Sequence, residues 1–295
     1  MSESAIYRPH PEEAANAMLQ SESAGVNSEE VWAGLRADRF ELVSRGDFVS
    51  GILYRPIEIA ESTQNDPASP GVPLLLIQHA LGGSNLDKSL ACAAAWAKRG
   101  LAVASIDLPL HGRRASPKLS DRLIDGCRRI ASGEELDLDT GALVVEFARQ
   151  STSDLIRTLD ALSAIDGVDA NRIGYMGFGL GAIVGSYLLA HDPRPCAAVF
   201  VLRADSLADK RGPDELDAVT YLEKAGIWAD GIGEARRLLF VAPEGPVKST
   251  EENLDALFKA APEPKELHRF APETPDLPKQ TLQRIEDFLS QALKF

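Results

Sequence analysis

The chain has 295 residues, of which 44% are hydrophobic and 25% are charged. These fractions are typical of globular proteins and exclude a disordered chain or a collagen-like fibre. The 31 Lys and Arg residues against 44 Asp and Glu residues give a net charge of -13. Phosphate-binding surfaces need clustered basic residues, so no nucleic-acid partner is expected. No apolar run approaches the roughly 20 residues of a membrane-spanning helix, so no membrane association is expected either.

The three cysteines, Cys92, Cys127 and Cys196, are widely spaced and form neither a C-x-x-C pair nor a cluster with histidines. This pattern supports neither a disulfide framework nor a zinc site, and we expect no metal or other cofactor. The first residues are acidic and polar rather than basic and then apolar. They argue against a secretory signal and favour a cytoplasmic protein.

Residues 1–38 form a polar N-terminal extension, in which a short amphipathic helix is predicted over Pro11–Gln20. From Phe40 apolar and polar residues alternate, which predicts two strands joined by the turn Arg45-Gly46-Asp47. We therefore divide the chain into this extension and a single domain over residues 39–295.

After Pro73, short apolar runs alternate with longer helical segments. The predicted strands are 74–77, 101–106, 173–176, 197–202, 238–241 and 267–270, and the predicted helices are 86–99, 143–165, 180–190, 252–260 and 279–293. Nearly continuous apolar strands suit a sheet that is covered on both faces. The fold class is therefore α/β: a doubly wound, mostly parallel sheet that begins with an antiparallel hairpin. Residues 111–140 and 206–233 are expected to form small cap or loop excursions.

Three motifs follow predicted strands, where open α/β sheets bind their ligands. They are an H-G-x-G-G-like stretch at His79–Gly83, a D-x-P-x-H-G-like stretch at Asp107–Gly112, and the approach Asp169–Phe178, which leads into the glycine-rich turn Gly177–Gly181. Together they resemble the α/β-hydrolase family, in particular its bacterial dienelactone-hydrolase-like and prolyl-oligopeptidase-like members. The resemblance covers roughly residues 35–293. It implies an α/β-hydrolase fold and an oxyanion hole made by the backbone N–H groups of Leu81 and Leu180.

The same resemblance exposes a departure at each catalytic position. The nucleophile elbow of the family reads G-x-S-x-G, whereas this chain has Gly179 in place of the serine. The position of the catalytic acid matches Gly245 or the following proline, and the position of the catalytic histidine matches Pro275. None of these residues can act as nucleophile, acid or base, so the usual triad is predicted to be lost.

Other polar residues near these positions are pocket candidates. His79 and His111 follow strands at the ligand-binding edge, where each either braces a loop by hydrogen bonds or serves as an acid or base. Glu244, Glu273 and Asp276 lie near the former acid and base positions. They form either an acidic pocket for a cation or metal, or a set of solvated loop carboxylates. Cys127 is a further conceivable nucleophile, but no neighbour in the sequence marks it as activated.

Two hypotheses follow. The first is an α/β-hydrolase-fold protein that is silent as a serine hydrolase and binds a small-molecule ligand or a protein partner. The alternative is an enzyme, an ester or lactone hydrolase or a lyase, that uses non-standard acid and base residues in the same cavity. The identity of the ligand and the formation of a homo-oligomer stay open at this point.

Overall fold

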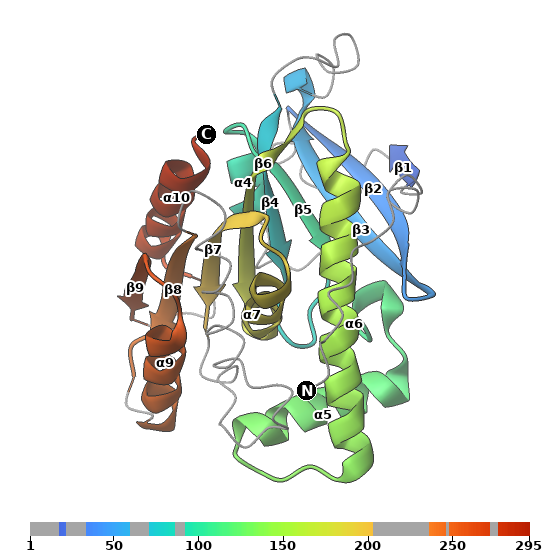
Figure 1. Cartoon of the computed structure of the whole chain (residues 1–295), viewed down its shortest axis with the longest axis vertical. Coiled ribbons are helices and arrows are strands. Elements are labelled where there is room, and N and C mark those ends of the chain that lie inside the picture. Colours follow the sequence, from blue (N-terminus) through green and yellow to red (C-terminus); the bar gives the residue numbers. More distant parts are fainter. Residues whose placement is uncertain are drawn as a thin grey trace, which may run out of the picture.

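The structure is a computed structural model that describes residues 18–21, 34–59, 71–85, 92–202, 236–245, 248–271 and 277–295. These residues form one nine-stranded sheet, with the order β1-β2-β3-β5-β4-β6-β7-β8-β9 (Figure 1). The strands are β1 (Met18–Ser21), β2 (Leu35–Ser44), β3 (Asp47–Pro56), β4 (Val72–Gln78), β5 (Ala102–Ile106), β6 (Val168–Phe178), β7 (Pro195–Val201), β8 (Arg237–Pro243) and β9 (Lys265–Phe270). The helices are α4 (Cys92–Ala97), α5 (Pro117–Ala131), α6 (Leu138–Ser163), α7 (Leu180–His191), α9 (Lys248–Ala260) and α10 (Lys279–Leu293), with a short 3₁₀ turn, η2, at Gly112–Arg114.

The N-terminal strands are antiparallel. β2 and β3 form the predicted hairpin, with Ser44 paired to Asp47 next to the turn, and β3 pairs antiparallel with β5. The prediction of a helix over Pro11–Gln20 is wrong at Met18–Gln20, because these residues belong to β1 and pair with β2. The free edge of β2 offers backbone hydrogen bonds to an extended segment, and this overrides a weak helical pattern. Residues 11–17 lie outside the described residues.

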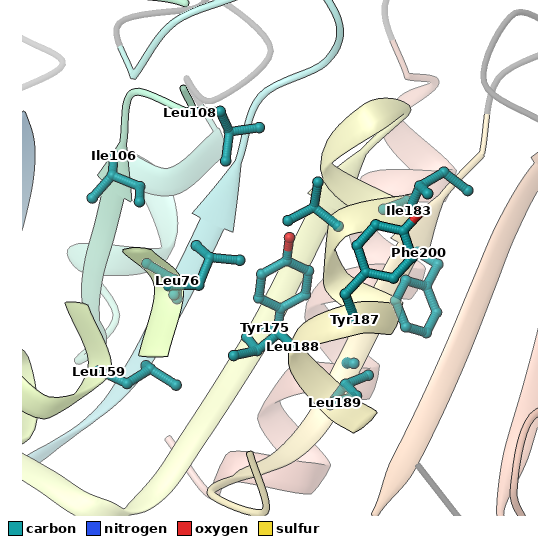
Figure 2. Packing of buried hydrophobic residues seen from close by; sticks show 14 of the residues in the cluster. Leu76, Ile106, Leu108, Leu159, Tyr175, Ile183, Tyr187, Leu188, Leu189 and Phe200 are labelled. Atoms are coloured by element: carbon teal, nitrogen blue, oxygen red, sulfur yellow. The ribbon is translucent and has the colours of Figure 1, made fainter. Parts of the chain in front are cut away.

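From β5 to β9 the sheet is parallel and covered on both faces, as predicted. Along β4, Leu74 and Leu76 face the core under α6, α7 and α9, whereas Leu75 and Ile77 face the core under α4 and α10. Figure 2 shows the first of these cores, where Leu76 of β4 lies between Ile106 of β5 and Tyr175 of β6. Among the described helices, none is long and apolar enough to cross a membrane.

The stretch 111–140, predicted as a loop or small cap, is mostly helical. It contains η2 and α5, and α6 begins at Leu138, five residues before the predicted start. Asp137 caps α6 by accepting the Thr140 N–H at 2.9 Å, and α5 buries Leu123 and Ile130 against the rest of the domain. α5 lies beyond the C-terminal ends of the parallel strands (Figure 1). The second predicted excursion, 206–233, lies outside the described residues.

Candidate functional site

The glycine-rich turn between β6 and α7 has the backbone of a nucleophile elbow. β6 ends at Phe178 and α7 begins at Leu180, so Gly179 alone joins strand to helix. Its φ of 54° and ψ of -111° lie outside the regions that residues with a side chain normally adopt. The Gly179 N–H donates to the Val201 carbonyl at 2.9 Å, and its carbonyl accepts from Ala182 and Ile183. The passage from strand to helix is therefore a sharp turn, and its central residue has no side chain.

The two flanking glycines are fixed by close packing. A Cβ on Gly177 would lie 2.3 Å from the carbonyl carbon and oxygen of Gly181. A Cβ on Gly181 would lie 2.8 Å from the carbonyl oxygens of both Gln78 and His79. The buried hydroxyl of Tyr175, in β6, donates a hydrogen bond to the Gly181 carbonyl at 2.5 Å. The first turn of α7 is thus held directly against the loop that follows β4.

That contact brings together the two segments of the predicted oxyanion hole. The backbone of Gly181 packs against the carbonyl of His79. Gly181 directly follows Leu180, and His79 stands two residues before Leu81. In the described part of the chain, no acceptor receives a hydrogen bond from the N–H group of Leu81 or Leu180. The joint role of these two N–H groups stays a prediction. Helix α5 also borders the loop that follows β4, since a Cβ on Gly82 of this loop would lie 4.0 Å from Cδ1 of Ile124 in α5.

His79 is fully buried and both of its ring nitrogens are engaged. Nδ1 is 2.8 Å from the Ala80 carbonyl and therefore carries the proton, while Nε2 accepts the Leu108 N–H at 3.2 Å. These bonds tie the loop after β4 to the loop after β5. An imidazole in this arrangement has no free lone pair with which to act as a base.

His111 differs from His79 because one of its ring nitrogens has no partner within the described part of the chain. Nδ1 donates to the Pro109 carbonyl at 2.8 Å, and the ring lies against Phe147, with centroids 5.9 Å apart. Nε2 is buried and has no hydrogen-bond partner among the described residues. Burial lowers the pKa of His111, so the ring is neutral near pH 7 and Nε2 carries a lone pair. Of the candidate histidines, His111 alone presents an unused acceptor in the described structure.

The loop after β5 is anchored by a buried carboxylate. Asp107 accepts from the Asn85 N–H at 2.7 Å, the Arg113 N–H at 3.0 Å and the Ser50 hydroxyl at 3.3 Å. Gly112 must be glycine because a Cβ there would lie 2.3 Å from the Asp107 carboxylate. The D-x-P-x-H-G motif therefore serves, at Asp107 and Gly112, to fix the loop rather than to react.

Arg114 extends this network to α6 and the hairpin. It donates to the Asp107 carbonyl, to the Asp154 carboxylate at 2.7 Å and to the Asp47 carboxylate at 2.6 Å. Burial raises the pKa of Asp154, and the positive charge of Arg114 opposes that rise. Sequence analysis missed this pair because its partners are 40 residues apart and no local pattern links them.

Of the predicted acid and base positions, the structure describes only the first, where Gly245 has no side chain that could react. Glu244 and Gly245 follow β8 and are exposed, and the Glu244 N–H donates to the Phe270 carbonyl at 2.7 Å. β8 is two strands from β6, about 10 Å along the sheet. Glu273, Pro275 and Asp276 lie outside the described residues. Across the described chain, no three His, Cys, Asp or Glu side chains gather as metal ligands.

The other two described histidines, His191 and His268, and Cys127 lie away from this turn. His191 ends α7, where its Nδ1 donates to the Tyr187 carbonyl, and the helix separates it from the elbow by about 18 Å. His268 lies in β9, with Nε2 3.2 Å from the Thr281 hydroxyl. Burial raises the pKa of the Cys127 thiol to about 12, so it is protonated at neutral pH. Cys127 is therefore not an activated nucleophile.

No family model matches the sequence, and no curated protein matches it. Solved structures do match. An esterase from an Arctic intertidal metagenomic library, described as cold-adapted, superposes with a TM-score of 0.64 at 18% identity, over 93% of this chain and 99% of that one. The acetyl xylan esterase of Paenibacillus sp. R4 gives 0.67 at 14% identity, over 94% and 89%. The putative dienelactone hydrolase of Klebsiella pneumoniae gives 0.57 at 16% identity, over 87% and 99%.

The chain has the α/β-hydrolase fold. The match spans nearly the whole length of these neighbours, and the strand order agrees with the predicted fold class. The superpositions establish the fold alone, because at identities this low the neighbours' chemistry cannot be transferred. The chemistry has to be derived from the residues of this chain. Within the fold, the elbow turn and its two neighbouring loops keep their backbone contacts, whereas Gly179 stands at the centre of the turn.

Proposed function

We propose that this α/β-hydrolase-fold protein binds a small organic molecule with an oxygen-bearing polar group over Gly179, without serine catalysis. The observation that carries the proposal is the backbone of Gly179, which keeps the geometry of an elbow at a residue with nothing to attack a substrate. The N–H groups of Leu81 and Leu180 would hydrogen-bond an oxygen of the ligand.

The magnitudes favour binding over turnover by the usual mechanism. In serine hydrolases, loss of the triad costs about 10⁶ in kcat. Backbone N–H donors and binding alone leave about 10³–10⁴ over the uncatalysed reaction. A site with Gly179 at its centre therefore keeps the means to hold a carbonyl or carboxylate oxygen, but has no serine nucleophile with which to cleave an ester efficiently.

A test of binding uses butyrate and two variants of Leu180. Leu180→Pro removes the predicted N–H donor at the first position of α7, where helices tolerate proline. Leu180→Ala shortens the side chain but keeps the donor, and is the matched control. We expect butyrate to raise the Tm of the wild type and of Leu180→Ala, but not of Leu180→Pro. Equal shifts in all three proteins would show that this N–H group binds no ligand.

A second candidate function is an enzyme that uses Nε2 of His111 as a general base. Two observations favour it: this buried nitrogen has no partner among the described residues, and the solved neighbours include proteins named as esterases and hydrolases. Only the neutral ring accepts a proton, and burial lowers the pKa of His111 below 6.5. Turnover of p-nitrophenyl butyrate would then rise as pH increases through that lowered pKa and level off above it.

One variant distinguishes the two candidate functions. His111→Phe keeps a ring beside Phe147 and removes the lone pair. If the second candidate holds, this variant loses the turnover of the wild type while the butyrate-induced shift in Tm remains. Turnover at the buffer rate in both proteins supports binding alone.

A further inference from the structure

Gln78 and His111, at the C-terminal end of the sheet, together carry three buried polar atoms that have no partner in the described structure. These atoms are the amide nitrogen and the amide oxygen of Gln78, and Nε2 of His111. Gln78 is 0% exposed and His111 is 3% exposed, so bulk water does not reach them. A buried polar atom without a hydrogen bond is costly, and native proteins rarely leave a whole amide unsatisfied.

The two side chains come from neighbouring strand ends. Gln78 is the last residue of β4, and His111 follows the end of β5, which pairs in parallel with β4. His79, next to Gln78, has its ring 5.2 Å from the ring of His111. Side chains alternate along a strand, so Gln78 shares the face of Leu76, which packs in the core under α6 and α7 (Figure 2). His111 contacts Phe147 of α6, which belongs to that same core.

The hydrogen-bonding needs of the three atoms are complementary to one small molecule. Because Nδ1 of His111 donates to Pro109, Nε2 needs a donor. The Gln78 oxygen also needs a donor, and the Gln78 nitrogen needs an acceptor. A water molecule offers two donors and a lone pair, which satisfies all three, and an amide or a hydroxyl group satisfies most of them.

The charged groups near these atoms already have partners. The Asp107 carboxylate is held by Asn85, Arg113 and Ser50, and the Arg114 guanidinium is held by Asp47 and Asp154. The imidazole and the amide are themselves neutral. A molecule held between Gln78 and His111 would therefore be neutral as well, since an ion would be buried without a countercharge.

We propose that Gln78 and His111 together bind one small neutral hydrogen-bonding molecule behind the elbow: a water, or the amide or hydroxyl end of a ligand. Gln78 also belongs to the segment that packs on the first turn of α7, because its backbone carbonyl would lie 2.8 Å from a Cβ on Gly181. The inference does not depend on the proposed function, since it concerns atoms that must be satisfied whether or not a ligand binds over Gly179.

A crystal structure of the full chain, free and soaked in acetamide, tests the proposal directly. Electron density within hydrogen-bonding distance of the Gln78 amide and of Nε2 of His111 in the free crystal identifies bound water. Replacement of that density by acetamide shows that a ligand's amide end also fits. A dry contact between these atoms and apolar side chains in both crystals would overturn the proposal.

Thermal unfolding of Gln78→Met gives an independent check. If the amide holds a molecule shared with His111, the variant loses that molecule, leaves Nε2 unpaired and lowers the Tm by about 2 °C. If the amide sits unsatisfied in a dry core, its removal raises the Tm, and the proposal fails. Leu76→Met is the matched control, because it makes a similar change on the same face of β4 where only apolar atoms meet.

Discussion

The loop after β5 and the turn between β6 and α7 lie at the same edge of the sheet but are held in place by different interactions. Buried charge fixes the first, through the Asp107 carboxylate and the Arg114–Asp154 ion pair. Close backbone contact fixes the second, through Gly177 and Gly181. Both arrangements carry a cost, since the first buries charged groups and the second leaves no room for a side chain at Gly177 and Gly181.

This difference separates the shape of the site from its reactivity. Both segments are firmly held at the C-terminal edge of the sheet, yet Gly179 bears no nucleophile and both ring nitrogens of His79 are hydrogen-bonded. Among the described residues, the turn at Gly179 is thus fixed by its neighbours, while its central residue bears no reactive side chain. Such a combination fits a protein that still uses the shape of this edge, as the proposed ligand binding requires.

The largest effect is expected when the charge network of the β5 loop is broken. Arg114→Met leaves the fully buried Asp154 carboxylate without its cation and lowers the free energy of unfolding by about 3–5 kcal/mol in urea titrations. Arg113→Met is the control, because the neighbouring Arg113 side chain is exposed. Equal losses in both variants would show that the buried pair has no special role.

The same variant has a predicted dependence on pH. A carboxyl whose pKa is raised in the folded state destabilises that state as pH rises from the unfolded to the folded pKa. Removing Arg114 raises the pKa of Asp154 further, because the opposing positive charge is lost. The stability deficit of Arg114→Met should therefore be smaller at about pH 5 than at pH 7.5. A deficit that is constant over this range would contradict the assignment to Asp154.

A smaller loss is expected from the carboxylate itself. Asp107→Asn replaces one acceptor oxygen by an NH₂ group facing backbone donors, and should cost about 2–3 kcal/mol. Asp121→Asn, on the exposed side of α5, should change stability little. If Asp107→Asn were as stable as the wild type, the claim that the Asp107 carboxylate fixes the loop after β5 would be wrong.

The turn after β6 should respond to added volume rather than to lost charge. Gly177→Ala places a methyl group 2.3 Å from Gly181 backbone atoms and should cost about 1–3 kcal/mol. Gly141→Ala, in α6 with open space around its Cβ, should instead stabilise the protein by about 0.5–1 kcal/mol. Opposite signs for these two substitutions, measured by urea titration, would confirm that packing requires the glycine at 177.

The sheet and most helices could be predicted because their apolar residues carry a strong periodic signal. The sequence pattern did not predict the strand β1, the helix α5 or the start of β2 at Leu35. β1 is extended because it pairs with β2, a long-range contact that its own residues do not specify. α5 is amphipathic, but the glycine and arginine residues within it weaken its apolar pattern in the sequence.

One position of the candidate site, Gly179 between strand and helix, could be located from the sequence, because closely spaced glycines mark a sharp turn. The spacing of the glycines placed Gly179 at the elbow, and the structure places it between β6 and α7 with the backbone of that turn. The roles of Arg114, Asp154 and Gln78 depend on contacts between distant segments, which the sequence does not display. The histidines could be located at the strand ends, but only their hydrogen bonds distinguish a braced ring from one with a free nitrogen.

The central claim, an intact elbow without a nucleophile, is tested most directly by mass spectrometry of the whole protein after treatment with a serine-directed fluorophosphonate. An active serine esterase treated in parallel acquires one adduct and controls for the reagent. The wild-type chain is expected to keep its unmodified mass, because Gly179 offers no hydroxyl at the turn. A single stoichiometric adduct on one serine, formed at the rate of the control enzyme, would contradict the account.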